Sequence, residues 1–441
     1  MTKPTAVPAL TKPRKPRKLT VTDVTVPNGL RVFVVRKPGV PLVEVRLRVP
    51  FQSGKAGHSA RAALLSDALL TGTGTMSRTG LAASVQALGA DLNAGVDADR
   101  LLIGGNALAT NLRPLLDILA SVLVDAAYAK DEVAIERDRL VERLSIARSR
   151  AGVVAAEALA HRMWGEHPYA RDLPQPEDVA AITPAQLRAL HAARIRPEGA
   201  VLVVVGDVTP SRVVDQVAAA LAGWTGAPDA ARIPALPSPV PGPLVVVDRP
   251  GSVQSSIRLG GTALTRSDPD YPALQLANLI FGGYFSSRWT ENLREDKGYT
   301  YGSHSRIEHN VLGSSLLFDV EVATEVTAPS VLETRYELGR IASLPVTAEE
   351  VDAVRQYAIG TLALSTATQA GLASTLTALA AHGLGIDWIA DHPARLAAVG
   401  VDEVSAAAAR FFAPSRLVEV VVGDAATITE PLRALGPVAE D

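Results

Sequence analysis

The segment Val201-Leu-Val-Val-Val-Gly-Asp-Val208 returns near the C-terminus as Val418-Glu-Val-Val-Val-Gly-Asp-Ala425. Each copy is a short apolar run rich in β-branched residues, a pattern that favours a strand covered on both faces. In each copy a Gly-Asp turn ends the strand. The two copies lie about 217 residues apart. Self-similarity at a fixed spacing indicates an internal repeat.

Segments upstream of the two strands support this repeat. A helix and connector ending in Arg196-Pro precede the first strand, and a similar pair ending in Phe412-Ala-Pro precedes the second. Further back, Asp131-Glu-Val and Glu349-Glu-Val each open a long predicted helix at nearly the same offset. We therefore predict that the chain is a duplication.

The predicted halves are residues 21–232 and 243–441. Residues 233–242 are rich in proline and predict a semi-rigid linker. Residues 1–20 are basic and carry several prolines that would break a helix, so we expect a disordered tail. No apolar segment follows these charges, as a secretory signal would require.

Within each half the predicted elements follow one order: two strands, an apolar helix and, further along, a long helical block. Strands interspersed with helices in this way indicate an α/β sandwich in each half. The predicted strands are 31–35 and 43–49 in the first half and 244–247 and 255–260 in the second; the apolar helices are 60–70 and 271–279, and the helical blocks are 131–163 and 348–381.

The composition narrows the classes of function. A net charge of −3 over 441 residues gives no support for binding to nucleic acid or to an anionic membrane. No apolar run approaches the roughly 20 residues that span a bilayer. The absence of cysteine rules out thiolate catalysis and Cys-based zinc sites, and it fits a cytoplasmic location. The richness of the chain in Ala, Val and Arg suggests a bacterial source.

One stretch in the second half combines polar chemistry with a turn. Between Leu279 and Gly302 the pattern predicts a glycine turn at Gly282-Gly283, a helix over 286–296 and a strand from about residue 299. Arg294 and Tyr301 flank the break at Gly298, so a guanidinium and a phenol can converge where the helix meets the strand.

Together these segments resemble the pitrilysin-like (inverzincin) metallopeptidases, the family of insulin-degrading enzyme and mitochondrial processing peptidase. The resemblance covers the chain after residue 20. It implies an α+β fold of two homologous α/β-roll domains, each with a mixed, mainly antiparallel sheet flanked by helices, which form half of a clam shell. It rests on the two Val-Val-Gly-Asp strands and on Gly72-Thr73, Leu88-Gly-Ala-Asp-Leu-Asn-Ala94, His167-Pro-Tyr-Ala-Arg171 and Asn292-Leu-Arg-Glu-Asp-Lys-Gly-Tyr-Thr-Tyr301.

Family members that cleave peptides carry His-x-x-Glu-His on the first long helix, where two histidines bind zinc from one helix face and the glutamate is the general base. Counting back from Gly72-Thr73, the two histidine positions hold Ala63 and Asp67 and the glutamate position holds Ser66. The third-ligand position falls at Glu142 or Arg143. We therefore expect no metal and no other cofactor in this chain.

Histidines elsewhere do not replace the lost ligands. His304-Ser-Arg-Ile-Glu-His309 nearly spells the motif, but its histidines are five residues apart and would stand on opposite faces of a strand. His58 has no partner at ligand spacing.

In the pitrilysin-like family, the resemblance implies that an Arg and a Tyr seven residues apart in the second half face the zinc across a central chamber. Arg294 and Tyr301 match that spacing, and Gly282 and Gly283 would contribute to substrate binding. The two polar side chains can donate hydrogen bonds to a substrate carbonyl. In two-chain members one subunit carries zinc and the other carries this pair.

The leading hypothesis is therefore a non-catalytic subunit of a heterodimeric zinc endopeptidase. Its partner would be a zinc-bearing pitrilysin-like subunit, and peptides would add as a strand to a sheet edge in that partner. One alternative is a structural or peptide-binding protein of the same fold without a peptidase role. Another is an enzyme that uses Ser66 and Asp67, although no basic neighbour in the sequence would activate the serine.

Overall fold

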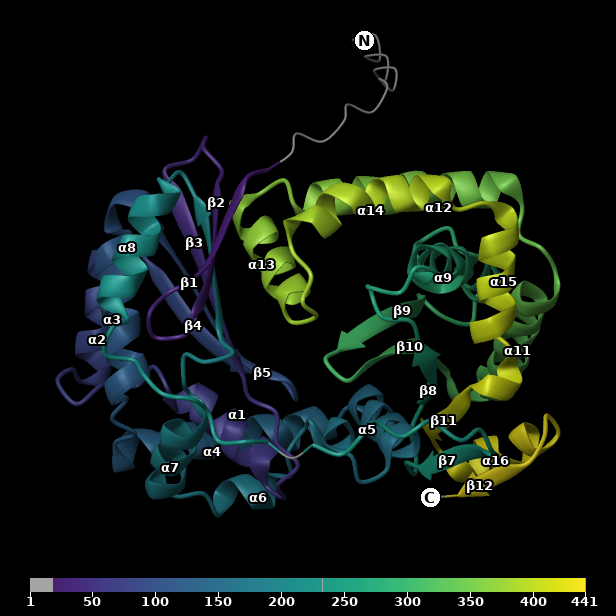
Figure 1. Cartoon of the computed structure of the whole chain (residues 1–441). Coiled ribbons are helices and arrows are strands. Elements are labelled where there is room, and N and C mark those ends of the chain that lie inside the picture. The colour runs from purple at the N-terminus through teal and green to yellow at the C-terminus, as the bar shows by residue number, and fades with distance from the viewer. Residues whose placement is uncertain (1–18, 232, 441) are drawn as a thin grey trace, which may run out of the picture.

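The computed structural model describes residues 19–231 and 233–440, so most of the predicted basic tail lies outside the described residues. The described chain forms two lobes, each built around a six-stranded sheet with helices packed against it (Figure 1). Each sheet is mixed and mainly antiparallel, which confirms the predicted α+β class. None of the described helices is both long and apolar enough to cross a membrane.

The first sheet has the strand order β1-β2-β6-β3-β5-β4. Only the β2–β6 pair is parallel, and the repeat strand β6 is buried at every residue. The strands are β1 (Val21–Thr25), β2 (Arg31–Arg36), β3 (Leu42–Pro50), β4 (Asp91–Val96), β5 (Arg100–Leu108) and β6 (Val201–Gly206).

The second sheet has the order β12-β7-β11-β8-β10-β9, in which five strands occupy the same places as their counterparts in the first sheet. The sixth place differs: β1 pairs antiparallel with β2, whereas β12 pairs parallel with β7. The duplication read from the sequence is thus present in the topology. The strands are β7 (Leu244–Asp248), β8 (Gln254–Ala263), β9 (Ser303–Asn310), β10 (Gly313–Ala323), β11 (Val418–Gly423) and β12 (Val438–Glu440).

Helices cover one face of each sheet with residues from the same lobe, and these layers form the two largest cores. The helices of the first lobe are α1 (His58–Ala68), α2 (Arg78–Ala87), α3 (Leu112–Asp125), α4 (Lys130–Arg148), α5 (Ala151–Trp164), α6 (Pro176–Ala180), α7 (Pro184–Arg194) and α8 (Pro210–Ala220). Those of the second lobe are α9 (Tyr271–Asn278), α10 (Arg288–Thr290), α11 (Thr327–Ser343), α12 (Ala348–Ser365), α13 (Gln369–Ala380), α14 (Ile386–Ala398), α15 (Val401–Phe411) and α16 (Ala425–Arg433).

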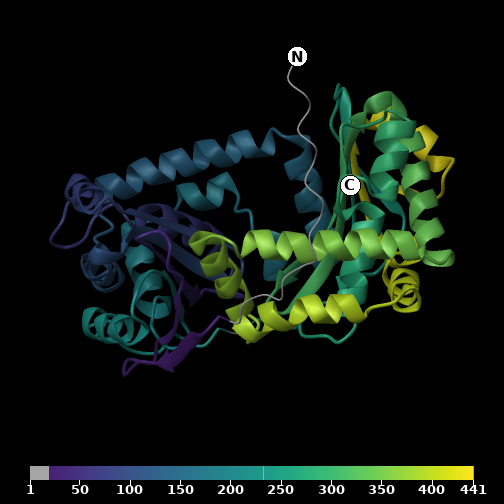
Figure 2. The same cartoon turned by 90° about the horizontal axis from the view of Figure 1, so that it is seen from above.

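The opposite face of each sheet is covered by a helix from the other lobe. Helix α13 places Leu372 and Leu376 on Phe33 and Val203 of the first sheet. Helix α12 leads to α13, reaching from the second lobe toward the first (Figure 2).

Helix α5 makes the reciprocal crossing, placing Leu159 and Met163 on Val418 and Val420 of the second sheet. The helix approaches Gly260 closely: a Cβ there would lie 2.4 Å from the sulfur of Met163, so the methionine side chain would have to move. The two lobes therefore share two smaller apolar clusters in addition to the core that each has of its own.

The tip of the β9–β10 hairpin makes a polar contact between the lobes. The backbone N–H of Val311 donates to Asp99 Oδ2 (2.8 Å), and that of Leu312 donates to the hydroxyl of Tyr169 (3.1 Å). Tyr169 in turn donates to Asp99 Oδ1 (2.7 Å). Asp99 and Tyr169 are both buried, so the hairpin tip is fixed against the first lobe.

Candidate functional site

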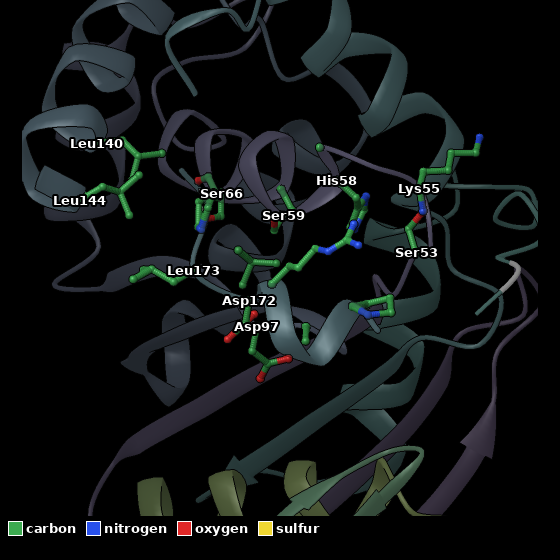
Figure 3. Close-up of a pocket in the computed structure, with 18 of the residues that line it drawn as sticks. Ser53, Lys55, His58, Ser59, Ser66, Asp97, Leu140, Leu144, Asp172 and Leu173 are labelled. Atoms are coloured by element: carbon green, nitrogen blue, oxygen red, sulfur yellow. Dashed lines mark hydrogen bonds between the residues drawn. The ribbon is translucent and has the colours of Figure 1, made fainter. Parts of the chain in front are cut away.

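The positions that the sequence predicted to be a degenerate zinc motif lie in one cleft of about 380 Å³. Ala63, Ser66 and Asp67 on α1 form one wall, and Leu140, Arg143 and Leu144 on α4 form another. Figure 3 shows Ser66 of α1 opposite Leu140 and Leu144. The structure thus brings together the residues that counting along the sequence had assigned to a single degenerate site.

An ion pair links α1 and α4 in this cleft. Arg143 donates from Nη2 to Asp67 Oδ2 at 2.6 Å and lines the cleft, whereas Glu142 does not line it. Burial raises the pKa of Asp67, and the hydrogen bond from Arg143 opposes that shift. Of the two residues left open by the sequence, Arg143 is therefore the one that faces the degenerate motif.

These residues do not fit a zinc ion. Ala63 offers no ligand atom, Asp67 is already paired, and the guanidinium of Arg143 would repel a cation at the same place. Across residues 19–231 and 233–440, no group of three or more His, Cys, Asp or Glu side chains could hold a metal.

Ser66 and His58 are also committed to structural hydrogen bonds. Ser66 Oγ donates to the backbone oxygen of Ala63 on its own helix (3.0 Å), and Nε2 of His58 donates to the backbone oxygen of Phe51 (2.6 Å). Burial lowers the pKa of His58 to about 4, so its ring is neutral near pH 7. A serine without a neighbouring base is a poor nucleophile.

The edge strand β4 forms a third side of the cleft through Ala94, Gly95 and Val96. Its only strand partner in the described sheet is β5, and its residues alternate between exposed and half-buried. An extended peptide could pair with such an edge.

Arg294 lies on the π-helical segment η4 (Glu291–Asp296), outside this cleft. Its guanidinium carbon is 4.4 Å from the centre of the Phe285 ring, a cation–π distance, and its Nε is 3.5 Å from Glu295 Oε1. Phe285 is 67% exposed. The sequence interpretation missed Phe285; an aromatic directly after Gly-Gly-Tyr, on the stretch that carries Arg294, was the available signal.

Tyr301 projects into solvent and is 99% exposed. It lies in a turn before β9, which begins at Ser303 and not near residue 299 as predicted. Thr300 fixes this turn, since its hydroxyl donates to the backbone oxygen of Glu321 (2.7 Å) and accepts from the N–H of Gly302 (3.2 Å). No described residue bonds to the Tyr301 hydroxyl, which leaves it free to meet another molecule.

Gly282 and Gly283 have a packing role in this structure. Gly282 is buried, and a Cβ there would lie 2.9 Å from Ser305 Oγ and 3.0 Å from Trp289 Cε3. A Cβ on Gly283 would lie 2.7 Å from the Asn278 side-chain nitrogen. Both belong to the π-helical segment η3 (Leu279–Gly283), which continues α9 without the predicted turn inside it. Their part in substrate binding remains a prediction.

Two protein-family models match the chain. One, described as insulinase (peptidase family M16), matches residues 57–177, and the other, described as the peptidase M16 inactive domain, matches residues 181–357. The first match includes α1. The second includes Arg294 and Tyr301.

Curated relatives carry related descriptions. An uncharacterized zinc protease of Mycobacterium leprae is 26% identical over 300 residues, covering 66% of this chain and 67% of that protein. A probable inactive metalloprotease of Bacillus subtilis is 26% identical over 225 residues, covering 50% of this chain and 52% of that protein. These alignments therefore span from about half to two thirds of the relatives' length.

Solved structures share the fold over nearly the whole chain. A peptidase M16 inactive domain from Pseudomonas fluorescens has a TM-score of 0.86 and 24% identity, covering 92% of this chain and 98% of that one. An M16-like peptidase structure from Alicyclobacillus acidocaldarius has a TM-score of 0.77 and 16% identity, with 92% and 99% covered. At these identities the likeness shows the fold.

Proposed function

Because this chain belongs to the pitrilysin-like M16 peptidase family, we propose that it is the zinc-less subunit of a heterodimeric zinc endopeptidase. Its partner would be a second M16-like chain that carries the zinc. This chain would contribute Arg294 and Tyr301 to the partner's site, and peptides would be the substrates.

The observation that carries the proposal is the contrast between the two candidate regions. In the first lobe, an ion pair joins Asp67 and Arg143, two of the positions that we assign to the degenerate zinc motif. In the second lobe, Tyr301 is fully exposed on a turn fixed by Thr300, without a described partner for its hydroxyl. A protein that kept the fold only as a scaffold would gain nothing from holding a bare phenol in this way.

The chemistry of the pair suits peptide recognition. A guanidinium and a phenol are both hydrogen-bond donors, and donors aimed at a carbonyl oxygen stabilise the charge that develops there during hydrolysis. Phe285 lies under the Arg294 guanidinium and would limit the orientations that it can adopt. We therefore assign transition-state stabilisation to Arg294 and Tyr301, acting on a substrate held by the partner.

The test is to express the chain alone and together with a zinc-bearing M16 relative from the same genome, and to measure cleavage of a quenched fluorescent peptide. We expect activity only in the mixture. In the mixture, Arg294→Ala with Tyr301→Phe should reduce kcat by roughly a hundredfold, the loss typical of removing an oxyanion donor. The matched control is Arg113→Ala with Tyr336→Phe, which alters an exposed arginine and an exposed tyrosine on helices α3 and α11.

Two outcomes would contradict the proposal. Metal-dependent cleavage by this chain alone would make it an enzyme in its own right. A mixed complex that keeps its full rate with the double variant would favour the alternative, a structural or peptide-binding protein of the same fold. The alternative would be supported directly if the zinc-bearing relative co-purified with this chain but cleaved peptides at the same rate with and without it.

A further inference from the structure

A second polar cavity, of about 320 Å³, lies where the two lobes meet. It is enclosed by the first sheet, the turn between β4 and β5, the C-terminal end of α13 and the β9–β10 hairpin tip. Its walls include Arg48, Arg266, His309 and His382. It is separate from Arg294 and Tyr301, neither of which lines it.

Arg48 is the unusual residue in this cavity. Its neighbour on β3, Leu47, is buried in the core of the first lobe, so Arg48 points to the opposite face of the sheet. Arg48 is 6% exposed, and its Nε is buried without a hydrogen-bond partner. No described carboxylate lies within ion-pair distance of it. A buried charge without a partner is costly, so its presence needs a reason.

Arg266 reaches the same cavity from the second lobe. Its Nε is also buried without a partner, and its guanidinium carbon is 5.7 Å from the centre of the Trp388 ring. Both arginines are close enough to His382 to lower its pKa, although burial is the main cause of that shift. Asp99 and Asp97 oppose part of the lowering that burial causes in the pKa of Arg48, but neither forms an ion pair with it. Two guanidinium groups from different lobes, each with an unpartnered Nε, thus face one cavity.

The other charged residues of the wall are largely matched. Arg100 pairs with Asp97 (2.9 Å), Arg306 pairs with Asp319, and the carboxylate of Asp99 accepts hydrogen bonds from neutral donors. With both histidines neutral and Asp319 counted as the partner of Arg306, four arginines face four carboxylates (Asp97, Asp99, Glu308 and Asp319), a formal balance of zero. A single negative charge disturbs this balance less than a dianion would.

We propose that Arg48 and Arg266 form a binding site for the carboxylate of a peptide. A planar guanidinium matches a carboxylate in shape and donates two parallel hydrogen bonds to it. The cavity is at the small end of the range for ligand sites, about 300–1,000 Å³, so it suits the end of a chain or one acidic side chain. The site belongs to this chain alone and does not depend on a partner subunit.

The test measures binding to the isolated full-length chain by calorimetry. The probes are N-acetyl-trialanine with a free carboxylate, its carboxamide, an amidated peptide with one internal aspartate, and inorganic phosphate. We expect the free acid to bind at least roughly tenfold more tightly than the carboxamide, because hydrogen bonds to a charged group are among the stronger ones. Equal binding of the aspartate peptide would identify an acidic side chain as a second source of the same group.

Arg48→Met and Arg266→Met should each weaken binding of the free acid by roughly tenfold or more. Arg113→Met, an exposed residue paired with Asp117, is the matched control and should leave binding unchanged. Arg48→Met should also leave the thermal midpoint unchanged or raise it, since it removes an unpaired buried charge. If Arg48 instead stabilised the fold, Arg48→Met would lower the thermal midpoint.

Three results would overturn the proposal: equal affinity for the acid and the carboxamide, tighter binding of phosphate than of the acid, or unchanged affinity in both arginine variants. None of these three binding measurements requires peptidase activity. Loss of the carboxylate site would therefore be distinguishable from failure of the proposed heterodimer.

Discussion

The Asp67–Arg143 ion pair joins α1 and α4 with little effect on stability. The two side chains are 23% and 59% exposed, and partly exposed ion pairs contribute about 0–1 kcal/mol. Arg143 therefore provides Asp67 with a hydrogen-bond donor in the cleft, but the pair does little to hold the two helices together. It follows that other side chains can be introduced here without unfolding the lobe.

This geometry predicts that a zinc site can be rebuilt. The variant with Ala63→His, Ser66→Glu, Asp67→His and Arg143→Glu should bind one zinc per chain, because positions 63 and 67 share a helix face and position 143 already meets position 67. Metal content after dialysis against zinc and then buffer provides the measurement. The control keeps Arg143 and changes the other three residues. Equal zinc in both proteins would contradict the assignment of Arg143.

A buried histidine predicts acid sensitivity. His392 is 1% exposed, Nε2 contacts Gln275 Oε1 (2.7 Å), and burial, with smaller contributions from Arg395 and Arg266, lowers its pKa to about 4. Below pH 6.5 the unfolded chain takes up a proton that the folded ring resists, so stability falls as the pH drops from about 6.5 toward 4. We expect this histidine to account for about 2 kcal/mol of lost stability between pH 7 and pH 5.

Urea unfolding at the two pH values measures this effect. His392→Gln should reduce the difference in unfolding free energy, whereas His161→Gln, at a residue whose side chain is 67% exposed, should leave it unchanged. The same pH dependence in wild type and His392→Gln would show that the ring is not the responsible group.

At the scale of residues, helix spacing alone decides which side chains of one helix lie near one another. Ala63, Ser66 and Asp67 could be placed together because they lie within one turn or so of α1. Glu142 and Arg143 could not be separated, since adjacent helical residues point about 100° apart and the packing of α4 on α1 decides which one faces the cleft. The cation–π contact of Arg294 with Phe285 likewise depends on how the chain folds back before η4.

At the scale of elements, the strands were the most predictable feature. The predicted strand 31–35 is observed as Arg31–Arg36, and 43–49 as Leu42–Pro50. The stretch 279–302 was less predictable, because a π-helical segment replaces the expected glycine turn and the strand starts later. Its local conformation is set by the packing of Gly282 and Gly283, which no local pattern encodes.

The tight packing at Gly282 gives a testable consequence. Gly282→Ala would place a methyl group 2.9 Å from Ser305 Oγ and 3.0 Å from Trp289, so we expect a loss of about 1–3 kcal/mol in unfolding free energy. Chemical denaturation provides the measurement. Gly339→Ala on α11 is the control: a Cβ there meets nothing within 4 Å, and alanine should be neutral or stabilising. Similar losses in both variants would point to a general effect of glycine replacement.

At the scale of the whole molecule, the reciprocal crossing of α5 and α13 was not predicted. The repeat correctly indicated two similar sheets, but it carried no information about which helix covers which sheet. Sequence periodicity shows that one face of an element is apolar, but it does not show which other element covers that face. Val203 of the first sheet and Val420 of the second are both buried by a helix. In each case that helix comes from the other half of the chain.

This crossing predicts that the halves depend on each other. Fragments 1–232 and 243–441, expressed separately, should aggregate or bind a hydrophobic dye, because each lacks the helix that covers one face of its sheet: α13 over Phe33 and Val203, or α5 over Val418. Expressed together, with a tag on one fragment, they should co-purify as a folded complex. The control is the intact chain cut at a protease site placed within residues 233–242, which should stay associated and keep its thermal midpoint. Two soluble fragments that unfold cooperatively on their own would contradict the shared core, because neither could then need the helix supplied by the other.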